Sequence, residues 1–251
     1  MAQQKGQVRL KGSIGDITYS ETRNGFKARE KKTVSADRIA NDPRFQRTRE
    51  NMAEFGHAIK AGKLLRTSLR TLLLNSSDGR MTTRLTKSMF GVLKSDPVGF
   101  RGERTVMKGD IGLLRGFDFN ARAVLMQSIP NHFTVSIDRA LGELVVTIPP
   151  FVPKDQIVPP SGATHYRFNG AGMAVNFEGD KFETDIQRSG ILPWDMEETA
   201  LLTLKHGVTA NSTQPLFLVL GIDFFQESNG NMYPFKSGAF NALAIVDASG
   251  V

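Results

Sequence analysis

The spacing of apolar residues changes near residue 130, and this change constrains the fold more than any other feature of the sequence. Before it, apolar side chains recur every three or four residues, as at Met81, Leu85 and Met89. After it, they alternate with polar ones, as at Val135 and Ile137. The first pattern is typical of amphipathic helices, and the second of strands with one buried face. Because the two patterns are segregated along the chain, we predict an α+β fold rather than a parallel βαβ fold.

Residues 1–34 are predicted to form an extended basic arm. Short apolar pairs alternate with polar residues, and Asn24-Gly25 between two such pairs is typical of a tight hairpin turn. The pairs are Val8 and Leu10, Ile17 and Tyr19, and Phe26 and Ala28. Because this stretch is rich in glycine and in Lys and Arg, it is poorly suited to forming part of a hydrophobic core. We therefore expect an exposed hairpin whose main contact residues are Ile17, Tyr19, Asn24, Gly25 and Phe26.

Residues 35–130 are predicted to be a basic helical region. Asp42 is a suitable N-cap and Pro43 suits a first helical turn, so a helix should begin there. Its apolar residues Phe45, Met52, Phe55 and Ile59 recur at helical spacing. A second helix is expected over residues 80–94, ending before Asp96-Pro97. A short helix is expected near residues 120–127.

Residues 131–251 are predicted to form a β-rich body, an antiparallel sandwich or barrel. Strands are expected around residues 133–137, 144–148, 166–168, 173–177, 182–186, 200–204, 216–225 and 242–246. Turn residues separate them, including Asn169-Gly170, Gly179-Asp180 and Asn229-Gly230. The boundary at 130 need not separate independent domains.

Charge is distributed unevenly along the chain. Residues 1–130 contain 25 Lys and Arg against 12 Asp and Glu, whereas residues 131–251 contain 7 against 13. We expect a basic interaction face made of Arg44, Arg47, Arg49, Lys63, Arg66 and Arg70. We expect an acidic counter-face made of Asp180, Glu183, Asp195, Glu197 and Glu198. These faces would meet between copies of the chain or within one chain.

Motifs for catalysis, cofactors and metals are missing from the sequence. There is no cysteine, and no P-loop or Gly-x-Ser-x-Gly pattern. Glu54 and His57 have the Glu-x-x-His spacing of di-iron bundles, but the pattern occurs once where two copies are needed. Asp195 and Glu198 have the spacing of a helix cap, which we favour over a carboxylate site. We predict no catalytic, cofactor or metal residues.

Three segments resemble a family of uncharacterised proteins from Bacteroidota. They are residues 12–19 (GSIGDITY), residues 41–51 (NDPRFQRTREN) followed by Glu54-Phe55-Gly56, and residues 61–66 (AGKLLR). The resemblance covers roughly the first 75 residues. It implies a glycine-punctuated strand start, an Arg-rich helix and a β-rich remainder, and it implies no activity.

The sequence favours a structural subunit that assembles with copies of itself into a filament, tube or phage-like particle, with the arm joining neighbours. The alternative is a nucleic-acid-binding protein whose basic helices contact phosphates without sequence readout. A third hypothesis is an enzyme with a site built from scattered residues such as His57, His165 and Asp195. With no signal peptide or membrane span in the sequence, we expect cytoplasmic synthesis, with a particle or an extracellular assembly as the final location.

Overall fold

The structure, a computed structural model, describes residues 2–4, 8–22, 25–30, 34–129, 133–235 and 240–250. Contacts between residues group the chain into two compact units. Unit 1 is Met1–Arg49 and unit 2 is Glu50–Val251. The compositional change near residue 130 therefore falls inside unit 2 and does not coincide with this division.

Unit 1 contains a small antiparallel sheet with the strand order β1-β4-β3-β2. Its strands are β1 (Ala2–Gln3), β2 (Gly12–Ile14), β3 (Ile17–Thr22) and β4 (Gly25–Glu30). Strands β3 and β4 pair from Ile17↔Glu30 to Thr22↔Gly25, so the predicted hairpin is present. Asn24, the first residue of the predicted turn, lies outside the described residues. Val8 and Leu10 belong to no strand, because residues 8–11 form a connection that is held by the Gln4 side chain.

Two short helices follow the sheet. Ser35 caps α1 (Ala36–Asn41), and its Oγ accepts a hydrogen bond from the backbone N–H of Arg38 at 3.2 Å. Asp42 is a cap, as predicted, and accepts from the N–H of Arg44 at 2.9 Å. The turn that Asp42 caps is the 3-10 helix η1 (Pro43–Phe45), which continues directly into α2 (Gln46–Ser68).

Unit 2 combines helices with two antiparallel sheets. The remaining helices are α3 (Arg70–Leu73), α4 (Met81–Lys94), η2 (Ile111–Leu114), α5 (Leu125–Ser128) and α6 (Pro153–Gln156). Strands β5 (Thr134–Asp138), β6 (Glu143–Ile148) and β10 (Leu202–Gly207) form a three-stranded sheet in the order β10-β6-β5. The larger sheet contains β7 (His165–Asn176), β8 (Lys181–Arg188), β9 (Leu192–Pro193), β11 (Leu216–Ser228), β12 (Asn231–Pro234) and β13 (Ala242–Ser249). None of the helices in the described ranges has the length and apolar content that crossing a membrane requires.

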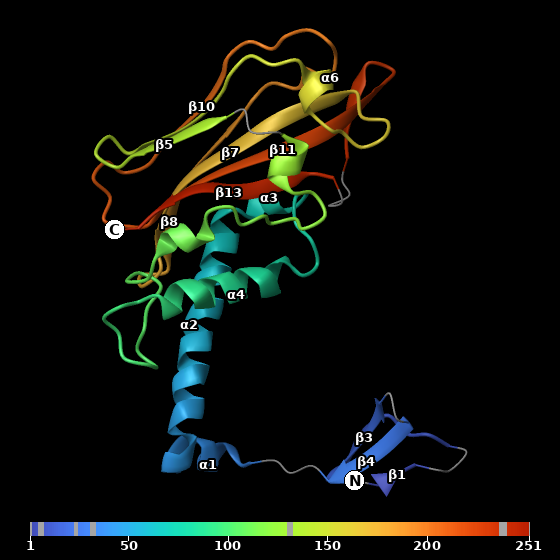
Figure 1. Ribbon diagram of the computed structural model, residues 1–251, viewed down its shortest axis with the longest axis vertical. Coiled ribbons are helices and arrows are strands. Elements are labelled where there is room, and N and C mark those ends of the chain that lie inside the picture. Colours follow the sequence, from blue (N-terminus) through green and yellow to red (C-terminus); the bar gives the residue numbers. More distant parts are fainter. Residues whose placement is uncertain are drawn as a thin grey trace. The chain divides into compact units, whose positions relative to one another are not determined.

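The larger sheet is the middle layer of unit 2. Figure 1 shows the helices α2 and α4 on one side of β7, β11 and β13, and β5 with β10 on the other. Alternate residues of each strand serve the two interfaces: Met173 and Phe217 pack with the helices, whereas Phe168 and Leu218 pack with the small sheet. This alternation explains why β11 is buried continuously from Leu216 to Ile222. The α+β class and the sandwich-like packing of antiparallel sheets are confirmed.

One expected turn is wrong. Asn169-Gly170 does not separate two strands, because β7 runs without interruption through both residues and pairs with β11 and β8. Asn169 is 3% exposed and the N–H and C=O groups of this stretch belong to the sheet ladder. Tertiary pairing has overridden the local turn preference. The turns at Asp180 and at Asn229-Gly230 are present, with φ values of 52°, 51° and 73°.

The expected helix cap at Asp195 is also wrong. Residues 195–200 form bends and irregular structure, with no helix after them. The Asp195 side chain instead accepts a hydrogen bond from the N–H of Glu197 at 3.0 Å, which closes a local turn.

The side of α2 that faces the core is not the side that carries Met52, Phe55 and Ile59. Its buried residues include Ala58, Ala61 and Gly62, and a Cβ added at Gly62 would lie 3.7 Å from Cγ of Leu85 in α4. Small side chains therefore let α4 approach closely, and Leu85 and Met89 of α4 fill the contact. The predicted apolar residues Met52, Phe55 and Ile59 remain 61%, 50% and 45% exposed. The predicted stripe of α4 does face the core.

Candidate functional site

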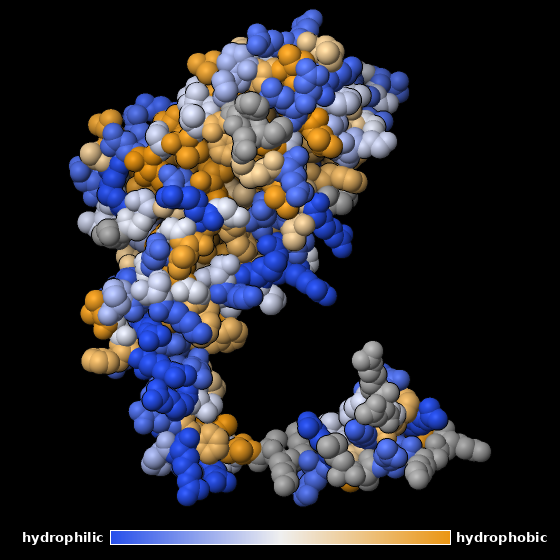
Figure 2. Space-filling model, in the orientation of Figure 1, coloured by the Kyte–Doolittle hydropathy of each residue, from blue (hydrophilic) through white to orange (hydrophobic). Residues whose placement is uncertain are grey.

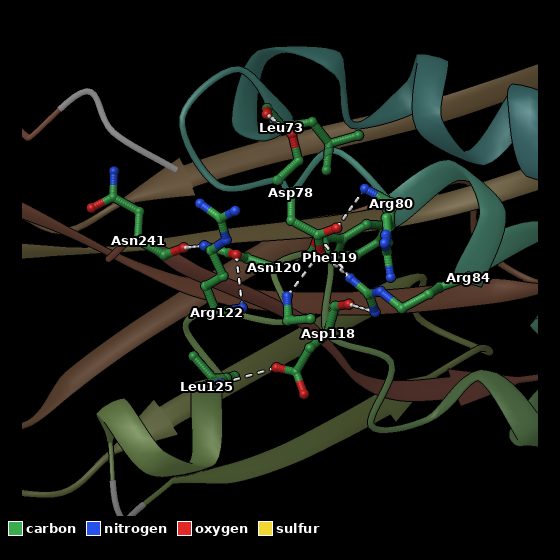
Figure 3. Close-up of polar contacts among 12 residues, drawn as sticks. Leu73, Asp78, Arg80, Arg84, Asp118, Phe119, Asn120, Arg122, Leu125 and Asn241 are labelled. Atoms are coloured by element: carbon green, nitrogen blue, oxygen red, sulfur yellow. Dashed lines mark hydrogen bonds and ion pairs between the residues drawn. The ribbon is translucent and has the colours of Figure 1, made fainter. Parts of the chain in front are cut away.

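One polar cluster of unit 2 surrounds Asp78 and Arg84 (Figure 3). Asp78 forms a close ion pair with Arg84 and accepts hydrogen bonds from the N–H groups of Arg80 at 2.7 Å and Ala121 at 2.9 Å. Burial alone would raise the pKa of Asp78, but these backbone donors and Arg84 outweigh it and hold the pKa below its usual range. Asp78 is therefore a stabilised carboxylate.

Arg84 connects α4 to the segment that follows η2. One terminal nitrogen donates to the carbonyl of Asp118 at 2.7 Å and the other donates to Asp78 and to the carbonyl of Phe119 at 3.3 Å. Asp118 accepts from the N–H of Leu125 at 2.9 Å, and burial raises its pKa. A hollow of about 530 Å³ lies beside this cluster. Both terminal nitrogens of Arg84 bind protein acceptors. We therefore interpret the cluster as a structural contact that holds the segment after η2 to α4, rather than as a reaction centre.

A second polar cluster holds the loop after α4. Glu54, 1% exposed, accepts from the N–H of Gly102 at 2.9 Å. Asp96 accepts from the N–H groups of Val98, Gly99 and Thr105 at 2.9 to 3.0 Å. Burial would raise the pKa of Asp96, but these three donors outweigh it and lower the pKa. Two carboxylates thus fix a loop whose tip exposes 81% of Phe100.

Glu54 is consequently not paired with His57 as a ligand. Nδ1 of His57 lies 3.4 Å from the carbonyl oxygen of Arg104, and His57 lines a cavity of about 260 Å³ with Phe177. Among the described residues, no group of three His, Cys, Asp or Glu side chains is placed to hold a metal ion.

The three residues of the enzyme hypothesis are not brought together in one place, although Asp195 comes two residues after Pro193, the strand partner of His165. His57 lies beside Phe177, whereas His165 begins β7 and pairs with Pro193. Twelve residues of extended strand separate Phe177 from His165, about 40 Å at 3.4 Å per residue. His57 in α2 and His165 therefore lie near opposite ends of β7.

His206 is fully buried, and no sequence pattern indicated a special role for it. Its ring is fully buried between the two sheets, and Nδ1 donates to the carbonyl of Asp185 at 3.1 Å. Nε2 has no hydrogen-bond partner and lies against Gly170. Burial lowers the pKa of His206, so the neutral ring is the stable form at neutral pH.

Except for Asn24, which is outside the described residues, the predicted arm residues lie in the sheet of unit 1. Strand register places one set of residues on a common face, since partners opposite each other point the same way. We call this set the apolar sheet face: Ile14, Ile17, Tyr19, Phe26 and Ala28. Gly25 lies at the β4 start with φ 100°, as a tight turn requires. No residue of unit 1 whose side chain the structure describes is buried.

The two faces of this sheet differ in charge. Lys27 and Arg29 of β4 project from the face opposite the apolar one, beside Ser20 and Thr18. The acidic residues Glu21 and Glu30 lie on the same side of the sheet as the apolar sheet face, and Glu21 pairs with Lys11 at 2.7 Å. The guanidinium of Arg9 lies 5.0 Å from the ring centroid of Phe26.

The six predicted basic residues are divided between the two units. Arg44, Arg47 and Arg49 belong to unit 1, and Arg49 donates to the carbonyls of Ile39 at 2.8 Å and Asp42 at 3.0 Å, at the end of α1. Lys63, Arg66 and Arg70 belong to α2 and α3 of unit 2. Within α2, Nε of Arg66 donates to the carbonyl of Gly62 at 3.3 Å.

The five predicted acidic residues are likewise separated. Asp180 pairs with Lys60 of α2 at 2.7 Å, and Glu183 accepts from Thr209 N–H at 2.9 Å. Glu183 lies opposite Ala174 of β7, whereas β9, which precedes Asp195, Glu197 and Glu198, lies opposite the start of β7. The two groups are thus about 27 Å apart along the strand.

Charge follows the two units closely. Unit 1 contains 12 Lys and Arg against 5 Asp and Glu, whereas unit 2 contains 20 of each. The whole formal net charge of +7 therefore lies in unit 1. Within unit 2, ion pairs such as Lys60–Asp180 and Arg115–Asp247 join the basic helical part to the acidic β-rich part.

An exposed apolar surface remains on α2. We call Met52, Phe55 and Ile59 the α2 stripe. The ring of Phe55 meets the partly buried ring of Phe90 in α4 edge to face, with centroids 6.1 Å apart. Nζ of Lys94 lies 4.5 Å from the Phe90 ring centroid. Figure 2 shows apolar surface among hydrophilic residues on the face of unit 2 that it presents. Sequence periodicity identified the stripe and missed its exposure.

Comparison with family models, curated proteins and solved structures found no match to this chain.

Proposed function

We propose that this chain is a structural subunit that assembles with copies of itself, in which unit 2 is the body and unit 1 links neighbours. The observation behind the proposal is the lack of a buried core in the described part of unit 1. A four-stranded sheet gains most of its stability when its apolar face is covered. Ile14 and Ile17 are 61% and 42% exposed, so a neighbouring molecule that covered them would stabilise the unit.

The mode of linkage follows from the sheet. Strands β3 and β4 already pair with each other and with β2 and β1, and the outer strands have only three and two residues. Short edges are poor templates for a further strand. We therefore propose contact through the apolar sheet face rather than strand addition, within a filament, tube or phage-like particle. The role is non-enzymatic.

The test is deletion of residues 1–34. Unit 2 has its own two hydrophobic clusters, so the truncated chain should remain folded, with a cooperative thermal transition. We expect the full chain to form oligomers or polymers by light scattering and the truncated chain to be monomeric. Assemblies of the same size from both chains would contradict the linking role of unit 1.

A second candidate, binding of nucleic acid, is favoured by the concentration of the net charge in unit 1 and by Lys27 and Arg29 on one sheet face. Backbone-phosphate binding predicts a steep fall of affinity with salt, by about a thousandfold between 50 and 200 mM for six or more contacts. A gel shift of DNA or RNA that is absent at low salt would remove this candidate.

A further inference from the structure

We infer that unit 2 binds a small, uncharged alcohol or phenol in the cavity that His57 lines, which we call the His57 cavity. Its volume of about 260 Å³ is small for a ligand pocket, so the matching ligand is one of few atoms. The proposed function assigns no role to this cavity, and all of its lining residues belong to unit 2.

The walls of the His57 cavity come from α2, from the loop after α4 and from the turn after β7. Each of the three segments supplies apolar surface, which consists of Ala61, Val106, Met107 and Phe177. The ring of Phe177 is held edge to face by the ring of Phe217, with centroids 6.2 Å apart. Concave surface that is mostly apolar and carries a few polar groups is typical of small-molecule sites.

Contacts between the walls form the cavity before a ligand binds. Asp96 accepts a hydrogen bond from the N–H of Thr105 at 3.0 Å, and Glu54 of α2 accepts one from the same loop at 2.9 Å. Lys60 of α2 pairs with Asp180, in the turn after β7, at 2.7 Å. The three walls are therefore already joined to one another. A preformed site loses less conformational entropy on binding than one that must be ordered by its ligand.

Thr105 brings an unused hydrogen-bonding group to the cavity wall. Its Oγ1 is buried and has no hydrogen-bond partner among the described residues. A buried hydroxyl without a partner is costly, so such a group calls for an explanation. Rotation about χ1 changes the direction in which this hydroxyl points. A ligand with its polar group near Thr105 would select the rotamer that hydrogen-bonds to it.

His57 supplies the second polar group. Its Nδ1 lies 3.4 Å from the carbonyl oxygen of Arg104, which favours the neutral ring with its proton on Nδ1. Nε2 is then an acceptor. A ligand hydroxyl can donate to Nε2 and accept from the Thr105 hydroxyl, which an apolar molecule cannot do. This pair of contacts indicates an alcohol or a phenol.

Charges around the cavity disfavour a charged ligand. Lys60 also lines the cavity, but its charge is matched by Asp180, and the Arg104 guanidinium lies beside Glu54, with Nε 3.9 Å from Oε1. Glu178, another lining residue, adds a negative charge that opposes a carboxylate or phosphate. A cation would leave water for apolar walls, and the exposed Glu178 would offset little of that cost. An uncharged ligand avoids both costs.

Four compounds with one ring each test the class of ligand on the full chain. Saturation-transfer NMR observes the ligand and works for a protein of any mass. We expect benzyl alcohol to bind with a Kd of about 1 mM or lower. Toluene lacks the hydroxyl, and benzoate and benzylammonium are charged, so each should bind at least about fivefold more weakly. Equal binding of all four compounds, or no saturable binding of benzyl alcohol below about 10 mM, would overturn the inference.

Two threonine variants test the place of binding. Thr105→Val should weaken benzyl alcohol binding about tenfold without lowering the thermal transition, because the hydroxyl that is removed has no protein partner to lose. The matched control is Thr184→Val in β8, whose Oγ1 is also buried without a partner among the described residues but which does not line the cavity. This control should leave binding unchanged. Equal affinity of the two variants would place the ligand elsewhere and overturn the inference.

His57→Phe provides an independent variant, because His57 is exposed and its replacement should leave folding intact even if Thr105→Val does not fold. The phenylalanine keeps a ring at the cavity wall and removes the acceptor Nε2. We expect about tenfold weaker binding of benzyl alcohol. Unchanged binding would overturn the inference, whatever the mass of the chain in solution.

Discussion

At the scale of single residues, buried polar groups explain the local order of unit 2. Glu54 and Asp96 lie under the loop at 96–105 and accept its backbone N–H groups. His206 lies between the two sheets with one ring nitrogen unpartnered. Each of these groups has a measurable effect on stability because a buried donor or acceptor without a partner is costly.

Substitution of Glu54 tests the first cluster. Glu54→Ala leaves the N–H of Gly102 without its acceptor, and removes a carboxylate 3.9 Å from Nε of Arg104. We expect the free energy of unfolding to fall by about 2 to 4 kcal/mol in urea denaturation. Glu103→Ala, at an exposed position of the same loop, should change it by less than about 0.5 kcal/mol. Equal effects of the two substitutions would show that Glu54 does not hold the loop.

Because the pKa of His206 is lowered, we expect the protein to lose stability in mild acid. Its pKa is lowered in the folded protein, whereas the unfolded chain binds a proton near pH 6.5. The unfolded state therefore binds more protons as the pH falls below about 6.5. The free energy of unfolding should decrease by up to about 1.4 kcal/mol per pH unit until the pH reaches the lowered pKa.

His206→Gln isolates this effect, because it retains an amide donor near the carbonyl of Asp185 and does not titrate. Denaturation curves between pH 7 and 5 should be flatter for the variant than for the natural chain. The pKa values of Asp78 and Asp96 are lowered in the folded protein. These two carboxylates therefore lose their contribution to stability only when the pH falls below the usual pKa of an aspartate, outside this pH window. The same slope in both chains would exclude His206 as its source.

At the scale of elements, close packing between layers overrides the local preferences on which sequence predictions rest. Asn169-Gly170 has a strong turn preference, yet Gly170 and Gly172 lie in the middle of β7 where the ring and Cβ of His206 press against the strand. No pattern within β7 indicates that contact, because His206 comes from β10, more than thirty residues later. Periodicity predicted most strands well because alternation reflects the two interfaces of the sheet.

Gly172→Ala tests this packing. An added Cβ would lie 2.5 Å from Cβ of His206, so one of the sheets must move. We expect a destabilisation of about 1 to 3 kcal/mol in thermal or urea unfolding. The matched control is Gly207→Ala in β10, where an added Cβ has nothing within 4 Å and the effect should stay within about 0.5 kcal/mol. A neutral Gly172→Ala would contradict the tight contact between the sheets.

The α2 stripe shows the same limit of sequence-based reasoning. The sequence located Met52, Phe55 and Ile59 on one stripe, but an apolar stripe normally faces a core. Which side of α2 is buried depends on Leu85 and Met89 of α4, which fit against Gly62. This long-range fit cannot be read from α2 alone, so the exposed stripe emerged only in the folded structure.

At the scale of the whole molecule, the units explain the charge distribution. The sequence contrast between residues 1–130 and 131–251 suggested a dipolar chain, but unit 2 contains equal numbers of acidic and basic residues. The net charge belongs to the unit that has no buried residue among those described. Linkage between copies would therefore depend on burial of apolar surface.

The measurement that tests self-assembly most directly is the mass of the purified, nuclease-treated full chain by light scattering at 0.15 and 1 M salt, with negative-stain electron microscopy in parallel. We predict regular rings, tubes or filaments at the lower salt, and their persistence in part at the higher salt because apolar burial is not screened. A uniform 27.6 kDa monomer under both conditions would contradict the account.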